Sequence, residues 1–352
     1  MSIIGNIGGQ SGGGSLTKSI LIVAAPTGST VTVTKGSTTK TAIEKNGEWW
    51  FKGLENGEWT IRAELDGQSA TEVINITQFG VYRKPISYRM TPEFTYTGDY
   101  EIVQDDDTPI EDFASWKGNW KIRLLTSSDF TITKMHGFAG KIDVFSVGGG
   151  GRGGRGALSV YSDTRETSGG GGGAGGYAKN SASLSISQGT VYKINIGAGG
   201  LSNSKGGATS AFGVTADGGS GGSDATSGQS PGNGGDGGSG GGGGSRRAAG
   251  GIGGSDGANG SKGNNVPSVY QPTNGLAGKG QLTTTREFAN PSGTLYASGG
   301  DGGLGISNGD SVAALAATPN TGNGSAGSQG LADSGPGGSG IVIIRNAREV
   351  AQ

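Results

Sequence analysis

The chain offers few residues for catalysis. It has one histidine, His136, and no cysteine. A serine triad or a histidine metal site would have to be built around that residue, which lies in the turn-like stretch Lys134-Met-His-Gly-Phe138. A glycosidase needs only two carboxylates, but no pattern frames a pair, so we predict no enzyme, no cofactor and no metal site. The carboxylates that such an enzyme could use are Glu166, Asp217, Asp236, Glu287, Asp301 and Asp310.

Two glycine-containing motifs resemble nucleotide or nucleic-acid sites only in their letters. Gly148-x-Gly150-x-x-Gly153 follows an apolar strand pattern, but no helix follows it to receive a pyrophosphate. Arg152-Gly-Gly-Arg155-Gly resembles an arginine-glycine box, but it occurs once and without interleaved aromatic residues. The formal net charge of -1 supplies no field that attracts nucleic acid. We predict no nucleic-acid partner.

Two further features of the sequence bear on calcium binding and on membrane insertion. Asp105-Asp-Asp107 sets three carboxylates together, which suits calcium, but an exposed acidic turn before Thr108-Pro109 is the commoner use of such a run. We favour the acidic turn. No stretch of about 18 apolar residues is present, so we predict no insertion into a membrane.

Residues suited to recognition interrupt the glycine runs. Tyrosine and arginine are common anchors of interfaces, and loops held by a rigid scaffold commonly carry recognition. The alternative is that these side chains only cap and solubilise the domain. The candidate recognition residues are Tyr161, Arg165, Arg246, Arg247, Tyr270, Arg286, Phe288 and Tyr296.

Whether these side chains can form a recognition surface depends on whether the glycine runs between them are ordered. The chain has 78 glycines in 352 residues, most of them between Gly148 and Gly340. Glycine loses much backbone freedom on folding and adds no side chain to a core, so a disordered linker is one interpretation. Strand patterns such as Thr190-Val-Tyr-Lys-Ile-Asn-Ile196 interrupt the runs, and the region closes on Ile341-Val-Ile-Ile344. A linker has no need of such strands.

Packed three-residue-per-turn helices would allow glycine runs to fold. Such helices have no internal hydrogen bonds, so their backbone groups bond to neighbouring helices. Collagen is excluded because the chain has only 10 prolines and no strict Gly-X-Y period. We therefore predict a bundle of polyglycine II helices. Its structural core is expected at Gly169, Gly170, Gly171, Gly172, Gly173, Gly241, Gly242 and Gly243.

The remainder of the chain has β patterns. Thr30-Val-Thr-Val-Thr34 alternates with period two, and turn pairs such as Asn46-Gly47 separate short strands, which predicts a small antiparallel sandwich. We expect an all-β fold. Its predicted parts are a flexible leader or attachment peptide at 1–18, the sandwich at 19–90, an aromatic-rich connecting β segment at 91–128, the glycine-rich domain at 129–346 and a tail at 347–352.

Both halves of the chain resemble known families. Ala25-Pro-Thr-Gly-Ser-Thr-Val-Thr-Val33 and Phe51-Lys-Gly-Leu-Glu-Asn-Gly-Glu-Trp-Thr-Ile61 resemble carboxypeptidase-regulatory-like and PEGA-like modules. Asp143-Val-Phe-Ser-Val-Gly-Gly-Gly-Gly151, Tyr192-Lys-Ile-Asn-Ile-Gly-Ala-Gly-Gly200 and Gly337-Gly-Ser-Gly-Ile-Val-Ile-Ile-Arg345 resemble, in that order, the glycine-rich domain of phage tail fibre and adhesin proteins. This resemblance implies a β scaffold from which polyglycine II helices project, with the loops between them forming a receptor-binding tip. A similar fold occurs in some animal receptor ectodomains, so the fold alone does not settle function.

The resemblance implies a tail-fibre or baseplate receptor-binding protein. Its expected partners are a bacterial surface receptor, either glycan or protein, and other phage tail or baseplate proteins. We expect it at the tail tip of the virion, after synthesis in the host cytoplasm, because the N-terminus lacks the pattern of a signal peptide. A homotrimer stays open, although no heptad pattern enforces one. The alternatives are a virion-associated glycan hydrolase and a purely structural tail spacer.

Overall fold

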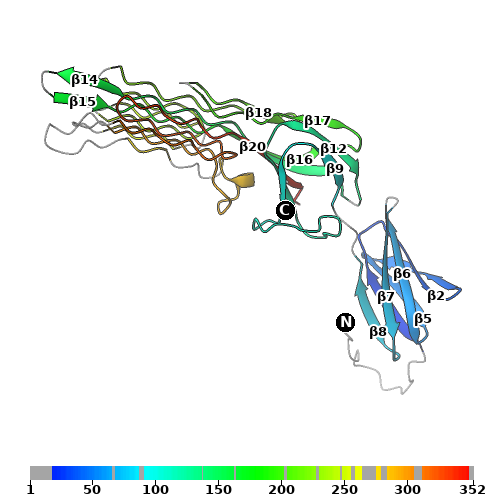
Figure 1. Cartoon of the computed structure of the whole chain (residues 1–352). Coiled ribbons are helices and arrows are strands. Elements are labelled where there is room, and N and C mark those ends of the chain that lie inside the picture. Colours follow the sequence, from blue (N-terminus) through cyan, green and yellow to red (C-terminus); the bar gives the residue numbers. More distant parts are fainter. Residues whose placement is uncertain are drawn as a thin grey trace. The chain divides into compact units, whose positions relative to one another are not determined.

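The computed structural model consists of two compact units (Figure 1). The first contains the chain up to Glu93 together with residues 112–118 and 135–139, and the second contains the remainder. Strands and one short 3-10 turn make up the regular elements of the described chain, so the predicted all-β fold is confirmed. The structure describes residues 18–65, 68–86, 91–136, 138–161, 164–201, 204–226, 230–245, 248–254, 258–263, 275–278, 284–304 and 311–348.

Two four-stranded sheets form the first unit. Their orders are β4-β5-β1-β8 and β3-β2-β6-β7, and neighbouring strands are antiparallel except for β1 and β8. Asn46 and Gly47 have φ values of 54° and 75°, as a tight turn between β4 and β5 requires. The strands are β1 (Ser19–Ala24), β2 (Thr30–Lys35), β3 (Thr38–Thr41), β4 (Ile43–Lys45), β5 (Glu48–Leu54), β6 (Gly57–Leu65), β7 (Gln68–Ile76) and β8 (Val81–Pro85).

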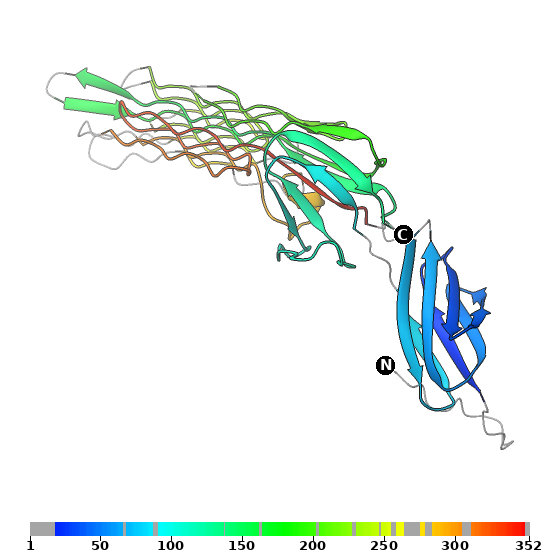
Figure 2. The same ribbon diagram turned by 45° about the vertical axis from the view of Figure 1, so that its right-hand side comes forward.

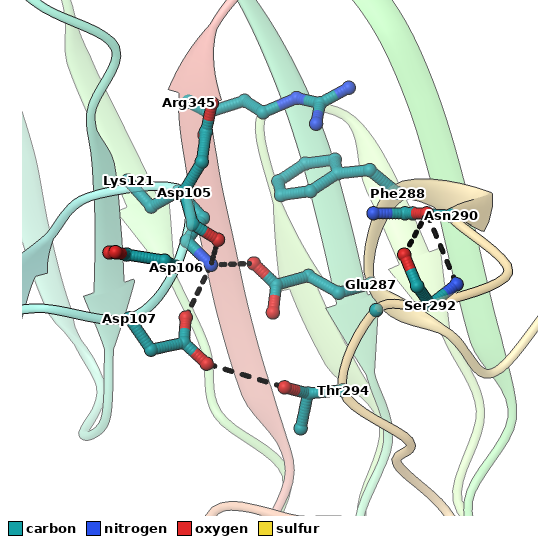
Figure 3. A pocket seen from close by; sticks show the side chains of 11 residues that line it. Asp105, Asp106, Asp107, Lys121, Glu287, Phe288, Asn290, Ser292, Thr294 and Arg345 are labelled. Carbon is teal, nitrogen blue, oxygen red and sulfur yellow. Dashed lines mark hydrogen bonds and ion pairs between the residues drawn. The ribbon is translucent and has the colours of Figure 1, made fainter.

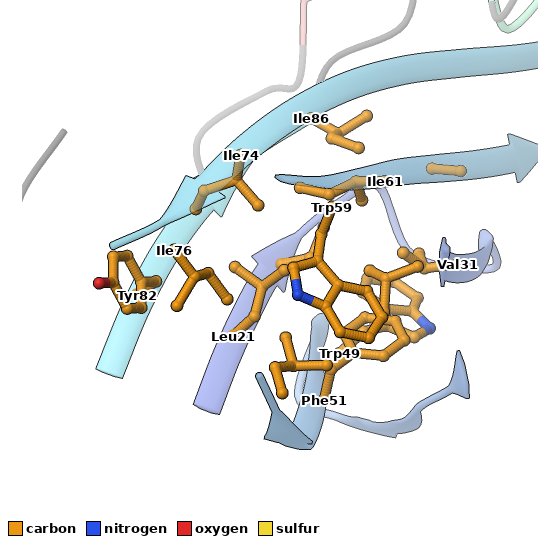
Figure 4. Close-up of a cluster of buried hydrophobic side chains, with 14 residues drawn as sticks. Leu21, Val31, Trp49, Phe51, Trp59, Ile61, Ile74, Ile76, Tyr82 and Ile86 are labelled. Atoms are coloured by element: carbon orange, nitrogen blue, oxygen red, sulfur yellow. The ribbon is translucent and has the colours of Figure 1, made fainter. Parts of the chain in front are cut away.

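Aromatic residues fill the core of this sandwich. Trp49 and Trp59 are 3 % and 2 % exposed, whereas Trp50 follows Trp49 on β5 and is only half-buried, as strand alternation requires. The buried pair packs with Phe51 and Tyr82 in one cluster (Figure 4). Each large apolar side chain buried in this way contributes roughly 1.5–3 kcal/mol, so the cluster is the main source of stability in this unit. The resemblance to carboxypeptidase-regulatory-like modules stays a prediction.

The glycine-rich part of the second unit begins and ends on strands of a β scaffold. β13 leads into the glycine runs at Gly148, and β20 receives the chain again at Ile341. These strands are antiparallel neighbours, with Val147 opposite Ile341, in a sheet of order β10-β11-β20-β13-β16. The glycine region therefore leaves and re-enters the scaffold at adjacent points, which fixes both of its ends.

The scaffold begins earlier in the chain than the predicted boundary at residue 129. β10 and β11, which lie within 91–128, pair with each other, and β11 pairs with β20. This stretch therefore supplies strands to the scaffold as well as connecting the units. The remaining sheets are β17-β12-β9, β14-β15 and β18-β19. The elements are β9 (Glu93–Tyr96), β10 (Tyr100–Val103), β11 (Lys121–Leu124), β12 (Ser128–Lys134), β13 (Lys141–Val147), β14 (Ala157–Tyr161), β15 (Thr164–Ser168), β16 (Ala178–Ser185), β17 (Val191–Ile194), β18 (Thr209–Ala211), β19 (Val214–Ala216), η1 (Glu287–Ala289) and β20 (Ile341–Asn346).

Extended segments packed side by side project from this scaffold, and we call them together the lattice (Figures 1 and 2). Their hydrogen bonds have a period of three, as expected for polyglycine II. In residues 169–177, every third N–H donates to the same antiparallel neighbour: Gly170 to Ser328, Gly173 to Ser325 and Gly176 to Gly322. Within the described chain, six segments bond to this one: 148–154, 217–223, 232–238, 239–242, 300–303 and 322–328. The predicted polyglycine II packing is confirmed.

A second segment, residues 239–245, is surrounded in the same way. Its N–H and C=O groups bond to six described neighbours: 169–177, 232–238, 248–253, 258–263, 275–278 and 299–303. The predicted glycine core, Gly169 to Gly173 and Gly241 to Gly243, therefore lies in segments that have described neighbours on every side, as residues 148–155 also have. The two longest glycine runs of the sequence lie in the segments 169–177 and 239–245, where the bonded neighbours leave no face for a side chain on the run.

No side chain fits at these central positions. A Cβ built on Gly171 would lie 1.8 Å from the carbonyl oxygen of Asn233, and one on Gly242 would lie 2.1 Å from that of Gly275. Segments with one face on solvent instead carry another residue at every third position, as Asn233 and the equally exposed Asp236 show. In this segment the spacing of the asparagine and aspartate marks the face that meets water, whereas Ser325 and Ser328, also three residues apart, are buried.

Candidate functional site

Some connections between lattice segments lie together at the end away from the scaffold sheets, where Figures 1 and 2 show the β14–β15 hairpin; we call this end the tip. Others, such as those from Gly238 to Ser239 and at 318–321, lie at the opposite end. Backbone hydrogen bonds hold the segments in register at the tip: Ala225 to Arg155 at 2.8 Å, Gly232 to Gly169 at 3.0 Å and Ser245 to Gly303 at 3.0 Å. Loops on a rigid framework are the usual carriers of recognition, so the tip is the candidate site. The described residues on the two sides of these connections lie at the tip: 156 and 169, 225 and 232, 245 and 248, 263 and 275, 303 and 311, and 328 and 334.

Two of the eight predicted recognition residues belong to the hairpin at the tip. Tyr161 is the last residue of β14, and Arg165 lies on β15, where it is paired with Val160. Three others, Arg246, Arg247 and Tyr270, lie outside the described residues. Their prediction as contacts for a partner stays untested.

The other three residues lie beside the scaffold instead. Arg286 donates from Nη1 to the Gly293 carbonyl at 2.8 Å. Phe288 packs against Phe145 and lies 4.0 Å beneath the guanidinium of Arg345. Tyr296 is 5 % exposed and belongs to the same apolar cluster as Phe145. This placement assigns the three residues to packing of the scaffold, and we leave them out of the tip surface.

Arg152 and Arg155 form a feature of the tip that sequence reasoning did not assign. Arg155 donates from Nε and Nη2 to the Leu331 carbonyl, at 3.0 and 2.7 Å. Arg152 donates from Nε to the Ser334 carbonyl at 2.9 Å. The two arginines are three residues apart, so the period of the segment sets both on the face toward residues 329–334. The motif that resembled an RNA-binding box is an attachment of one turn to the lattice.

Further hydrogen bonds hold this turn, residues 329–334, which we call the pinned turn. The Leu331 N–H donates to Ser311 Oγ at 3.0 Å. The buried Ser334 donates from Oγ to the Gly154 carbonyl at 2.7 Å. Ser328 donates from Oγ to the Ala332 carbonyl as the turn begins. The backbone of the turn is therefore fixed by side chains from the lattice and by its own flanking residues.

Acceptor side chains also complete the hydrogen bonding along the flanks of the lattice. A segment at the surface has no further neighbour on one side, so some of its N–H groups need another acceptor. Side-chain oxygens on the adjacent segment take that role: Asn233 for the N–H of Ala249 at 3.0 Å, Asp236 for Ile252 at 2.6 Å, Asn259 for Gly253 at 2.7 Å and Asp301 for Ala277 at 2.6 Å. These polar residues bind the lattice together, and we do not assign them to recognition.

A polar cavity of about 360 Å³ lies beside η1 on the scaffold (Figure 3). The Lys121 ammonium, only 5 % exposed, lies 2.5 Å from Asp107 Oδ1 and 2.8 Å from Glu287 Oε1. Arg123 reaches the same Asp107 oxygen at 2.6 Å. Two acids and two bases therefore neutralise one another across the cavity wall. The cluster holds η1 against the sheet, and its four charged side chains together carry no net charge.

The ionisation of this cluster follows its surroundings. Burial alone would raise the pKa of Asp107, but the hydrogen bond from Lys121 and the charge and hydrogen bond of Arg123 outweigh it, so the pKa is lowered. Burial raises the pKa of the Tyr296 hydroxyl above its ordinary range. Asp107 is thus ionised at neutral pH and contributes to the attachment of η1.

The acidic run and the histidine have structural partners. Asp105 accepts a hydrogen bond from Arg348, and Asp107 belongs to the cluster, so two of the three carboxylates make ion pairs. His136 lies in a turn, as expected, with Nε2 2.6 Å from Glu93 Oε1. No three metal-ligating side chains gather within the part of the chain that the structure describes. No helix there is long and apolar enough to cross a membrane.

Fold and site together define an all-β protein whose second unit is a lattice of polyglycine II segments on a β scaffold. Residues 126–347 match the family model described as a glycine-rich domain, and the chain belongs to this family. The match begins within the scaffold, close to β12, and ends just after β20, so it includes the lattice and its two anchoring strands. No curated protein and no solved structure gave a match to the chain.

Proposed function

We propose that the chain is a receptor-binding protein of a phage tail fibre or baseplate, and that its tip contacts a receptor on the bacterial surface. The observation that carries this proposal is a group of connections that share the free end of a lattice whose backbone groups are hydrogen-bonded to one another. The first unit would attach or space the tip, and other tail proteins would be its partners in the virion.

Physical reasoning supports a binding role for such a tip. Ordering a loop on contact costs free energy, and a loop already fixed by the lattice loses less freedom when it docks. The flanks of the lattice present backbone, polar side chains and single exposed aliphatic residues such as Leu201, Ile252 and Leu276. The connections differ from one another in residue type, so they can supply specific contacts without disturbing the packing beneath them.

Competition for adsorption tests this proposal. Purified full-length protein, added to the host strain before the virion, should reduce the fraction of virions that adsorb, and labelled protein should bind the same cells. A protein that neither binds these cells nor delays adsorption would contradict the proposal and favour a spacer.

The β14–β15 hairpin offers a matched variant for this experiment. Leu158 pairs with Thr167, so replacing residues 158–167 by Asn-Gly shortens both strands equally and leaves Ala157 opposite Ser168. The shortened protein should melt at nearly the same temperature, because the lattice beneath remains intact. We expect its binding to host cells to fall at least several-fold.

A further inference from the structure

The pinned turn presents apolar side chains on a fixed backbone. Leu331 is 50 % exposed, although its N–H and C=O groups are both held, by Ser311 and Arg155. Val312 is 54 % exposed on the adjacent segment, where it exchanges hydrogen bonds with Gln329 at 3.2 and 3.0 Å. Two exposed aliphatic side chains therefore occupy neighbouring backbone positions at the tip.

An acidic side chain lies in the same turn. The Asp333 side chain is 77 % exposed, and its Oδ1 is 3.7 Å from Arg152 Nη2 and 3.7 Å from Arg155 Nε. Ion pairs at this distance and exposure are weak, so the carboxylate can still accept hydrogen bonds from a partner. The turn thus combines an apolar surface with an adjacent acceptor of negative charge.

We propose that Val312, Leu331 and Asp333 form a preformed contact surface for a polypeptide part of the receptor, one with an apolar patch beside a lysine or arginine. This inference rests on the proposed function and specifies its partner. Arg152 and Arg155 are positioning residues: they hold the turn and do not contact the receptor.

The chemistry of the surface favours polypeptide over glycan. Sugars are recognised through dense hydrogen bonding and by stacking on aromatic rings, and valine and leucine side chains supply neither. A cluster of apolar side chains with a charged residue at its edge is instead the usual composition of a protein–protein interface. Charge complementarity with Asp333 then calls for a cation on the partner.

The arginines explain why an exposed leucine can contribute strongly here. Hydrogen bonds from a guanidinium to a carbonyl are charge-assisted and stronger than neutral ones. Because two such hydrogen bonds, both from Arg155, hold the Leu331 carbonyl, the turn loses less conformational freedom on binding. A leucine on a mobile loop would lose part of the same contact free energy to ordering.

Binding of labelled full-length protein to host cells tests the contact surface. We expect Leu331→Ala to weaken binding about 10-fold, the size of effect that a central contact residue gives, without lowering the melting temperature. Ile252→Ala is the matched control, because Ile252 is 64 % exposed on the flank of the lattice, and it should bind like the wild type. Asp333→Asn should weaken binding several-fold and reduce its dependence on salt.

Hydrogen exchange tests the positioning role. Arg155→Ala should accelerate exchange of the Leu331 amide while the amide of Gly171, inside the lattice, keeps its protection. The same variant should weaken binding by a smaller factor than Leu331→Ala. Unchanged exchange at Leu331 would overturn the role of Arg155.

Treatment of the cells distinguishes the possible partners. Protease treatment of the host surface should abolish binding, and periodate oxidation of surface sugars should leave it intact. The reverse result would overturn the polypeptide partner. Wild-type affinity of Leu331→Ala would overturn the contact surface and leave the proposed function standing, whereas failure of the wild type to bind the cells would remove both.

Discussion

The sandwich and the lattice achieve stability in opposite ways. In the sandwich, backbone groups pair within two sheets, and the space between the sheets is filled by tryptophan, phenylalanine and aliphatic side chains. In the lattice, backbone meets backbone with no layer of side chains between, and neighbouring carbonyls take the place of a core. Both arrangements exclude water and satisfy polar groups. The comparison shows that a dense hydrogen-bonded network can order even residues that lose the most freedom on folding.

The two units should therefore respond in opposite ways to added volume. Gly171→Val would disturb three backbone hydrogen bonds: from Gly171 to Ser223, from Gly154 to Gly171, and from Ser223 to Asn233. At about 1–3 kcal/mol for each of the three hydrogen bonds lost, the unfolding free energy falls by roughly 3–9 kcal/mol, the largest effect we predict. Calorimetry should show the transition of the glycine-rich unit lowered or lost.

Gly80→Val in the sandwich is the control for this change. A Cβ at Gly80 would meet only the Tyr82 ring, at 3.9 Å, which is ordinary contact. We expect the sandwich to lose less than about 1 kcal/mol, the range of surface substitutions. A valine at 171 that was tolerated as well as one at 80 would contradict backbone packing as the basis of the lattice.

Removing side-chain volume from the core should instead destabilise the sandwich and leave the glycine-rich unit unaffected. Trp59 is buried in the sandwich core, and Trp59→Ala should destabilise that unit by about 3–5 kcal/mol. The transition of the glycine-rich unit should stay in place, because the core of the sandwich is its own. Residues 19–90 expressed alone should likewise melt cooperatively with dispersed amide signals, and a random-coil spectrum would show that this unit is not independent.

Acid should affect the glycine-rich unit more than the sandwich. The folded pKa of Asp107 is lowered, so its contribution is complete above the unfolded value near 3.8 and is lost as pH falls through the lower folded value. The ion pairs of the sandwich are more exposed, as Arg62 and Glu64 illustrate, and should contribute less.

Melting curves from pH 6 to pH 2 with Asp107→Asn check this expectation. The variant should be less stable than the wild type at pH 6, and the difference should shrink toward pH 2 as the wild-type carboxylate is protonated. A difference that stayed constant over this range would show that the charge of Asp107 does not stabilise the attachment of η1.

The smallest effect should come from the acceptors on the lattice surface. Asp236→Ala removes the acceptor for the Ile252 N–H and should cost about 1 kcal/mol, because the freed group lies near water. Asp236→Asn keeps an oxygen at that position and should be nearly neutral. Faster hydrogen exchange at Ile252 in the alanine variant alone would support the role of the side chain, and equal exchange in both variants would contradict it.

Much of the fold follows from local patterns in the chain. Alternation places Trp49 inside the sandwich and Trp50 half-buried, and Asn46-Gly47 marks its turn, because strand geometry and positive φ are local properties. The glycine runs predicted packed polyglycine II, since no other packing uses residues without side chains in this way. The tip is less predictable from the sequence. Arg152 and Arg155 resemble an RNA-binding motif in the sequence, but in the fold they donate hydrogen bonds to carbonyl groups far along the chain.

Composition and period alone therefore established an all-β chain, its glycine-rich domain and the positions that tolerate no side chain. Only the folded chain shows which residues meet: Arg155 bonds to Leu331, Lys121 bonds to Glu287, and particular connections come together at the tip. The physical reason is that each backbone group in a polyglycine II segment can bond to any of several neighbours. Glycine has no side chain that would favour one neighbouring segment over another. The registers and the order of the segments are therefore set by the assembly of the whole lattice.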